Sequence, residues 1–201
     1  MTRLGLFGGS FNPIHIAHLI IADRFVEQLG LDRCYFIPAA QPPLKSIPPH
    51  ELAPAAHRVA MVQAAIAGHP RFEIDTCEVE RGGISYTIET VEHFRQRFPQ
   101  AELFLLIGAD QLLEFHLWHR WQQLVHLVQI CIAPRPMANP ERLQEQLARI
   151  HAASPQFLEV PLLEISSSDI RHRRARGLSI RYLVPEAVLR YIYEQRLYAP
   201  L

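Results

Sequence analysis

Short runs of consecutive apolar residues alternate with longer amphipathic stretches along the whole chain. Leu4–Phe7 and Leu103–Ile107 are two such runs, and neither contains a charged residue. Continuous apolar runs of this length are typical of strands buried on both faces of a parallel sheet. The amphipathic stretches repeat their apolar positions at helical spacing, as in residues 15–30. The alternation predicts an α/β fold, a doubly wound parallel sheet with helices on both faces.

Strand and helix boundaries follow from the same pattern. The apolar runs predict strands at 4–7, 34–37, 72–74, 103–107, 128–133 and 157–160. The amphipathic stretches predict helices at 15–30, 55–67, 87–98, 111–127 with a break near Trp118, from Asn139-Pro140 onward, 167–176 and 185–196. Only helices are predicted after the last strand. We therefore expect a single domain over residues 1–201, in which residues 166–201 form a small helical C-terminal part.

Composition narrows the class of protein. Of the 201 residues, 49% are hydrophobic and 20% charged, which is enough apolar material for a sizeable core. The formal net charge of +0 argues against a protein that coats nucleic acid or an anionic membrane. Cys34, Cys77 and Cys131 show no paired metal or redox spacing, which indicates reduced thiols of a cytosolic protein. Without a cleavable signal or an apolar span of ~18 residues, the sequence predicts a cytoplasmic location.

A proline-rich segment interrupts the pattern between the second predicted strand and the next helix. Residues 38–54 contain six prolines and cannot be regular structure for long. A long loop of this kind in a compact domain is usually functional or mobile. It carries Lys45, the only lysine of the chain. An exposed loop lysine is the ordinary interpretation, but its uniqueness favours a mobile positive charge that a closing loop delivers to a ligand.

The strongest local signal is Gly8-Gly9-Ser10-Phe11-Asn12-Pro13-Ile14-His15-Ile16-Ala17-His18. A strand that enters a glycine turn lets backbone amides approach a ligand closely, and the following helix presents its positive end there. His15 and His18 are three residues apart, on one face of the first helical turn. Their imidazoles can donate hydrogen bonds to phosphate oxygens. One alternative is a zinc-binding pair, but no third ligand stands at a recognisable spacing, and the other is two histidines on a polar surface.

A second anion-binding pattern lies near the C-terminus. Ser166, Ser167 and Ser168 supply an N-cap hydroxyl and small side chains at a helix start. Arg171, one turn later, can clamp phosphate with its planar guanidinium group. The basic residues that follow it are better read as a solvated helix face than as a nucleic-acid site, because the chain as a whole is neutral. Elsewhere, Gly108-Ala109-Asp110 follows an apolar strand, and the Asp110 carboxylate can accept hydrogen bonds from ribose hydroxyls or simply cap the helix.

These motifs together resemble the nucleotidyltransferase superfamily, in particular the bacterial-type nicotinate-nucleotide adenylyltransferases. The N-terminal motif is similar to that superfamily's Gly-Gly-x-Phe-Asp-Pro-x-His-x-Gly-His, and Ile165–Arg171 to its Ile-Ser-Ser-Thr-x-Ile-Arg. The remaining stretches that carry the resemblance, in chain order, are Phe36–Pro38, Pro42–Lys45, Ser85–Thr87, Ile107–Asp110, Trp118 and Tyr182–Pro185. The resemblance covers nearly the whole chain and implies a Rossmann-like nucleotidyltransferase fold.

The resemblance implies a set of site residues. It assigns catalysis to His15, His18, Lys45 and Arg171. It assigns ATP binding to Gly8, Gly9, Ser10, Phe11, Gly108, Asp110, Ser166, Ser167, Ser168 and Ile170, and the pyridine mononucleotide to Tyr86, Thr87 and Trp118. Mg²⁺ is expected to arrive with ATP, and no protein metal site is expected. Nicotinate mononucleotide is the expected acceptor, without nucleic acid or membrane partners, while the oligomeric state stays open.

Three positions depart from the family pattern. Asn12 stands where the family usually has Asp, Ala17 where it has Gly, and Leu44 where His commonly precedes the lysine. The alternatives are an adenylyltransferase for nicotinamide mononucleotide or for phosphopantetheine, and a non-catalytic sensor of pyridine nucleotides. We expect the acceptor's carboxylate to be favoured by backbone amides near Thr87 and Trp118. The acidic residues nearest to them in sequence are Glu89 and Glu114.

Overall fold

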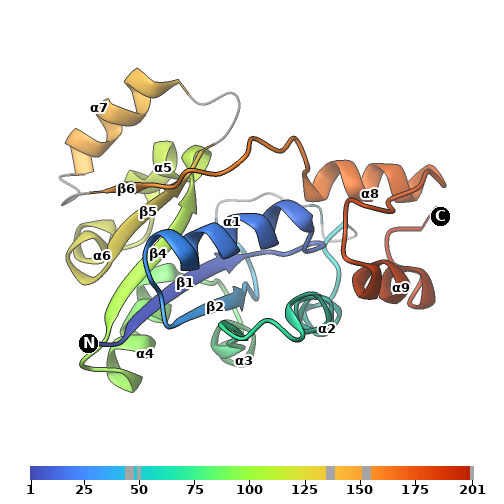
Figure 1. Cartoon of the computed structure of the whole chain (residues 1–201), viewed down its shortest axis with the longest axis horizontal. Coiled ribbons are helices and arrows are strands. Elements are labelled where there is room, and N and C mark those ends of the chain that lie inside the picture. The colour runs from blue at the N-terminus through green and yellow to red at the C-terminus, as the bar shows by residue number, and fades with distance from the viewer. Residues whose placement is uncertain (44–47, 49–50, 135–138, 151–154, 200–201) are drawn as a thin grey trace.

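The computed structural model describes residues 1–43, 48, 51–134, 139–150 and 155–199. Its centre is a six-stranded sheet in the order β3-β2-β1-β4-β5-β6, and each neighbouring pair is parallel (Figure 1). The strands are β1 Arg3–Gly9, β2 Arg33–Pro38, β3 Phe72–Ile74, β4 Glu102–Gly108, β5 Gln129–Ala133 and β6 Gln156–Phe157. The strand order reverses between β1 and β4. In doubly wound sheets, ligands bind at the carboxyl ends of the strands at this reversal.

Helices connect the strands and cover both faces of the sheet. They are α1 Ile16–Gln28, α2 Ala55–Ile66, α3 Cys77–Arg81, α4 Thr87–Arg97, α5 Ala109–Glu114, the 3₁₀ helix η1 Phe115–Leu117, α6 Trp121–Leu127, α7 Pro140–Ile150, α8 Ser167–Ala175 and α9 Glu186–Glu194. Buried residues of α1, α2, α8 and α9 form one hydrophobic cluster with the sheet. Those of α4, α5, α6 and α7 form a second cluster on the opposite face.

Strand β4 explains why the strands read as continuous apolar runs. Phe104 and Leu106 belong to the first cluster, whereas Leu103, Leu105 and Ile107 belong to the second. Because successive side chains of a strand point to opposite faces, both sets of positions must be apolar when both faces are covered. The prediction of a doubly wound parallel sheet is confirmed.

Gly5 of β1 lets helix α1 pack closely against the sheet. A Cβ atom at this position would lie 2.6 Å from the Phe25 ring and 2.7 Å from Leu31. Both of those side chains are buried in the first cluster. The glycine therefore sets how closely α1 lies over β1, and with it the position of the residues that begin α1.

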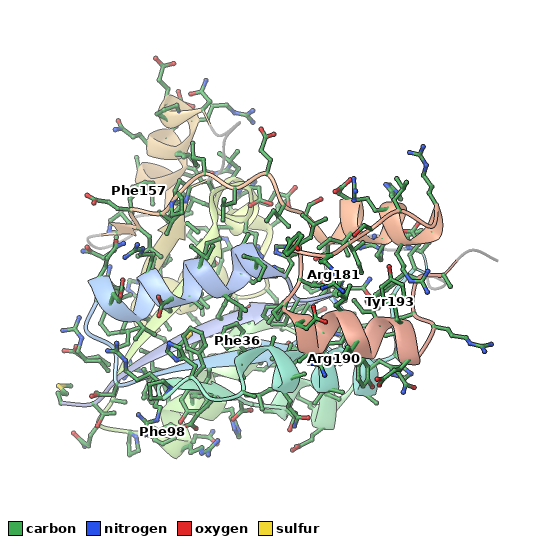
Figure 2. The ribbon with its side chains drawn as sticks, turned by 45° about the vertical axis from the view of Figure 1, so that its right-hand side comes forward. Phe36, Phe98, Phe157, Arg181, Arg190 and Tyr193 are labelled. Carbon is green, nitrogen blue, oxygen red and sulfur yellow. The ribbon has the colours of Figure 1, made fainter. Side chains whose placement is uncertain are left out.

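The C-terminal residues pack against the first half of the chain. Helix α9 lies beside α2, and His57 Nδ1 is 2.9 Å from the Tyr191 hydroxyl (Figure 1). Arg181, Arg190 and Tyr193 lie on this helical part, whereas Phe36 lies at the centre of the molecule (Figure 2). The described residues after β6 contain helices α8 and α9 but no further strand, as the sequence predicts.

Two elements of the structure differ from the sequence prediction. The predicted strand 157–160 is shorter and starts earlier, as Gln156–Phe157. The predicted break near Trp118 in helix 111–127 is confirmed, because this stretch is divided into α5, η1 and α6. The non-helical residues at the break are 118–120, and the last of them, Arg120, has a left-handed backbone conformation. Helix α3 was not predicted, since its five residues are too few to show a period. No helix of the described ranges has both the length and the apolar character needed to cross a membrane.

Candidate active site

Two cavities meet at the carboxyl ends of β1 and β4. They share lining residues from both strands and the turns after them, namely Gly8, Gly9, Ser10, Leu106, Ile107 and Gln111. The first, here called the histidine cavity, has a volume of about 610 Å³ and is lined by His15, His18, Ser166–Ser168 and Arg171. The second, the tryptophan cavity, has a volume of about 400 Å³ and is lined by Tyr86, Thr87 and Trp118. The site thus has two compartments separated by the glycine turn.

His15 and His18 form a stacked pair in the histidine cavity. His15 is the N-cap residue of α1, and its backbone N–H donates to His18 Nδ1 at 3.2 Å. The two rings stack with their centroids 3.6 Å apart, and His18 also packs against Phe7 and Phe11. Because His18 Nδ1 accepts a hydrogen bond, the proton of the neutral ring lies on Nε2, which is then a donor. Within the described part of the chain, no third metal-ligating side chain joins this pair.

The N-terminus of α8 is attached to the N-terminal motif. Ser166 Oγ accepts a hydrogen bond from the Asp169 backbone N–H at 3.1 Å, so Ser166 is the N-cap residue. Ser167 Oγ donates to the Pro13 carbonyl oxygen at 2.9 Å. Ser168 lines the histidine cavity. Ile170, by contrast, is fully buried in the first hydrophobic cluster and is not part of the lining.

Arg171, the last residue of the C-terminal motif, binds the N-terminal motif. It donates from one terminal nitrogen to the Asn12 carbonyl oxygen at 3.1 Å and from the other to Glu51 at 2.9 Å. Its Nε is buried and has no hydrogen-bond partner among the described residues. Since the side chain lines the histidine cavity, a ligand oxygen there can accept from Arg171.

Asn12 is fully buried and uses its amide as both donor and acceptor. Its Nδ2 donates to the Glu51 carbonyl oxygen at 2.8 Å. Its Oδ1 accepts from the Ala53 backbone N–H at 3.1 Å and from the Tyr198 hydroxyl at 2.7 Å. A carboxylate could not donate to the Glu51 carbonyl oxygen. This is a structural reason for asparagine at a position where the family pattern has aspartate.

Arg58 is a buried cation that the sequence does not reveal. Only 1% of its surface is exposed, and it donates to the carbonyl oxygens of Ser10, Ala40 and Ala53 at 2.9, 3.2 and 2.9 Å. Burial lowers the pKa of its guanidinium group. These bonds join the glycine turn to the segments after β2 and before α2, so Arg58 is a positioning residue for the turn. An arginine in an amphipathic helix is normally exposed, and no pattern distinguishes this one.

The tryptophan cavity is formed mainly by the start of α4 and the break after α5. Tyr86 is the N-cap residue of α4, and its ring is 4.5 Å from that of His119. Trp118 packs on Phe115 with the ring centroids 5.0 Å apart. The Trp118 backbone N–H already donates to the Phe115 carbonyl oxygen at 3.0 Å. The Trp118 backbone N–H, one of the donors expected to face the acceptor's carboxylate, is therefore already used within the chain.

Two acidic side chains, Glu78 and Glu114, also line the tryptophan cavity. Glu78 is buried and accepts a hydrogen bond from the Thr90 hydroxyl at 2.5 Å. Burial raises the pKa of Glu78, although the hydrogen bonds from Thr90 and Ser85 partly offset this effect. From the sequence, no acidic residue is expected immediately beside Thr87 or Trp118, and that expectation is wrong for the folded chain, because Glu114 and Glu78 both line this cavity. The short helix α3 brings Glu78 next to α4.

Asp110 and Gly108 line the histidine cavity at the end of β4. Gly108 is the N-cap residue of α5, and its backbone N–H donates to Gln111 Oε1 at 2.9 Å. Asp110 lies inside the first turn, so the helix-cap role considered from the sequence belongs to Gly108. A Cβ atom on Gly108 would collide with the Asp110 carboxylate, which lies directly over the glycine. Lys45 lies outside the described residues.

The chain is similar to known proteins over most of its length. Residues 6–173 match the model of a family described as cytidylyltransferase-like. A protein of Salinibacter ruber named "Probable nicotinate-nucleotide adenylyltransferase" is 41% identical over 98% of both chains. A protein of Thermomicrobium roseum with the same name is 42% identical over 98% of this chain and 92% of its own.

Solved structures show the same fold. Plasmodium falciparum nicotinic acid mononucleotide adenylyltransferase complexed with NaAD superposes with a TM-score of 0.80 over 98% of both chains, at 19% identity. The chain therefore belongs to the cytidylyltransferase-like family of nucleotidyltransferases, and within it to the nicotinate-nucleotide adenylyltransferases.

Proposed function

We propose that this protein transfers the adenylyl group of ATP to the 5′-phosphate of nicotinate mononucleotide, giving nicotinate adenine dinucleotide and pyrophosphate. The observation that carries the proposal is the pair of cavities that meet at Gly8–Ser10. One offers imidazole and guanidinium donors suited to phosphates, and the other offers aromatic rings suited to a pyridine. A reaction that joins two nucleotides through their phosphates needs this arrangement.

In this reaction the acceptor's phosphate attacks the α-phosphorus of ATP in line and pyrophosphate leaves. A phosphate monoester has a second pKa of ~6, so the attacking oxygen is already ionised at neutral pH and needs no general base. Catalysis then depends on positioning and on stabilising negative charge that develops on the leaving pyrophosphate. His18 Nε2 and the Arg171 guanidinium group are suited to that role, and Lys45 is proposed as a third donor.

Nucleotidyltransferases typically use a divalent metal ion, and we propose that here it is Mg²⁺ carried by ATP. The carboxylates that line the histidine cavity are Asp110 and Glu51. With so few carboxylates, an ion held mainly by phosphate oxygens and water fits the donor set. Mg²⁺ would neutralise phosphate charge, while the protein's own cations orient the triphosphate.

The acceptor's carboxylate is proposed to face backbone donors near Thr87. The amide of nicotinamide mononucleotide would turn its NH₂ group toward those donors, at a cost of ~1–3 kcal/mol for each mismatch. Glu78 and Glu114 also line the tryptophan cavity, and an ionised carboxylate there would weaken the preference for a carboxylate on the acceptor. The raised pKa of Glu78 favours its neutral form, which repels a carboxylate less than an ionised side chain would.

A pyrophosphate-release assay tests the proposal. ATP with nicotinate mononucleotide should release pyrophosphate and form the dinucleotide, while ATP with phosphopantetheine should not. A protein that binds pyridine nucleotides but turns over none of them would be a sensor instead.

The proposed setting is the cytoplasm, with a single domain over residues 1–201 and no nucleic-acid or membrane partner. The oligomeric state is left open.

A further inference from the structure

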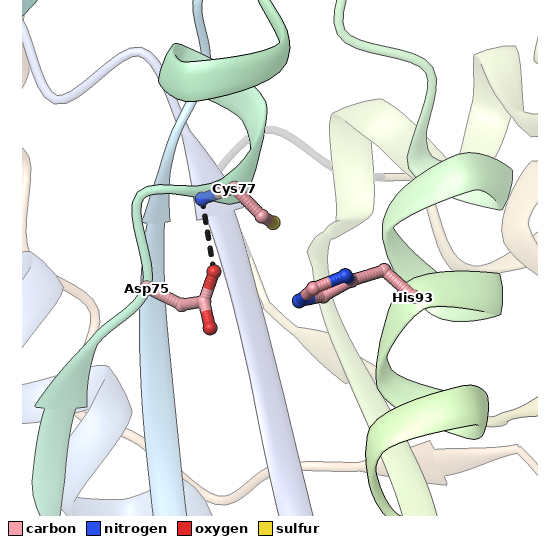
Figure 3. A group of neighbouring side chains, drawn as sticks. All are labelled: Asp75, Cys77 and His93. Carbon is pink, nitrogen blue, oxygen red and sulfur yellow. Dashed lines mark hydrogen bonds between the residues drawn. The ribbon is translucent and has the colours of Figure 1, made fainter.

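Three side chains with metal-binding chemistry converge outside both cavities. Asp75 follows β3, Cys77 begins α3, and His93 lies on α4. Each offers one ligand atom, and these atoms all lie within 4.8 Å of one another. Figure 3 shows the carboxylate, the thiol and the imidazole directed toward a common space between α3 and α4. None of the three lines the histidine or the tryptophan cavity.

The set of ligand types and their spacing suit zinc. Zn²⁺ binds Cys sulfur, His nitrogen and Asp oxygen at about 2.0–2.3 Å, in tetrahedral geometry. Around a tetrahedral ion with metal–ligand bonds of this length, the ligand atoms are about 3.5 Å from one another. Side-chain rotations that move the atoms by about 1 Å would therefore bring the three onto one ion. A water molecule would take the fourth coordination position of the ion.

The surroundings hold Asp75 in place while leaving it able to coordinate. Its Oδ1 accepts from the Cys77 backbone N–H at 2.9 Å, and its Oδ2 accepts from Arg97 at 2.8 Å. Each carboxylate oxygen keeps a second lone pair. The His93 ring makes no hydrogen bond with any described residue, so it is available as a ligand. The positive charge of Arg97 opposes a cation, and because that side chain is half exposed, the opposition is screened.

We propose that Asp75, Cys77 and His93 form a binding site for a zinc-like divalent cation, with water as the fourth ligand. A bound ion would link the start of α3 to α4. These helices carry Glu78, Thr87 and Thr90 of the tryptophan cavity, so the ion would fix one wall of that cavity. The site is separate from the ion carried by ATP.

Zinc binding to the full-length, metal-free protein tests the site. One equivalent of Zn²⁺ should bind, raise the melting temperature, and protect Cys77 from a thiol reagent. Cys77 is the only partly exposed thiol, since Cys34 and Cys131 are buried, so the protected thiol is identified without a variant. Co²⁺ in place of Zn²⁺ should give a sulfur-to-metal charge-transfer band. Absence of stoichiometric binding, or binding without protection of Cys77, would overturn the proposal.

Variants locate the ion. Cys77→Ser and His93→Gln should each weaken Zn²⁺ binding by at least about 100-fold, because each removes a direct ligand. His126→Gln on α6 and His18→Gln in the histidine cavity are the matched controls and should leave Zn²⁺ affinity unchanged. If binding survives in Cys77→Ser and disappears in His18→Gln, the ion occupies the histidine cavity and the proposal is wrong. Pyrophosphate release is a separate measurement, so either result leaves the proposed function standing.

Discussion

Glu51 and Arg171 form an ion pair with an N–O distance of 2.9 Å inside the histidine cavity, although they are 120 residues apart. The arginine is largely buried, with 11% of its side chain exposed, and the glutamate is partly exposed at 36%. The guanidinium group that is proposed to bind phosphate is thus paired with a carboxylate. ATP and Glu51 must compete for it.

Glu51→Gln should therefore strengthen ATP binding. Removing the competing charge at a partly exposed pair is worth up to ~1 kcal/mol, so KM for ATP should fall by up to about fivefold. Steady-state kinetics with varied ATP measures this effect. The matched control is Glu27→Gln, which removes a carboxylate from the exposed Arg24–Glu27 pair. A rise in KM for ATP in Glu51→Gln would mean that the carboxylate belongs to the ATP site.

His18→Ala should lower kcat by ~10²-fold or more, with little change in melting temperature. The Nε2 of His18 is a donor held in position by His15 and two phenylalanine rings. His15→Ala should also lower kcat, because it removes the ring that stacks on His18. His126→Ala on the exposed face of α6 is the control. Near-normal turnover in both cavity variants would remove the histidines from the catalytic assignment.

Asn12→Asp should destabilise the protein more than it changes turnover. The variant loses the Nδ2 donor and places a carboxylate against the Glu51 carbonyl oxygen. A cost of ~1–3 kcal/mol corresponds to a fall of about 2–12 °C in Tm for a chain of this size. We expect kcat to change by less than ~10-fold, which is below ~1.4 kcal/mol. In the control Asn139→Asp, the cap of α7 keeps its acceptor oxygen. A large gain in activity would show that an acid is needed at this position.

Glu78 should make stability depend on pH. Its pKa is raised by burial above the usual 4.5, so the folded state holds its proton to a higher pH than the unfolded state does. The free energy of unfolding should therefore fall as pH rises from the pKa of Glu78 in the unfolded state to its higher pKa in the folded state. Above the higher pKa the loss of stability should remain constant. Glu78→Gln removes this titration, so the Tm difference between variant and wild type should move in the variant's favour as pH rises. A difference that does not change with pH would contradict the assignment.

Much of the site was predictable from the sequence because it rests on short local motifs. The glycine turn, the histidine pair and the serine cap are each set by neighbouring residues, and the cavities bring them together as expected. Arg58 and Glu78 were not predictable. Their roles depend on burial against segments distant in sequence, and a polar residue in a helical pattern ordinarily indicates an exposed face.

The most direct test of the account compares the two pyridine mononucleotides under identical ATP and Mg²⁺. They differ only in a carboxylate or an amide on the ring, and charge-assisted hydrogen bonds to the carboxylate strengthen the discrimination. We predict that kcat/KM favours nicotinate mononucleotide by at least ~10²-fold, or roughly 3 kcal/mol. Equal use of both acceptors, or a preference for the amide, would contradict the proposed substrate while leaving the nucleotidyltransferase chemistry in place.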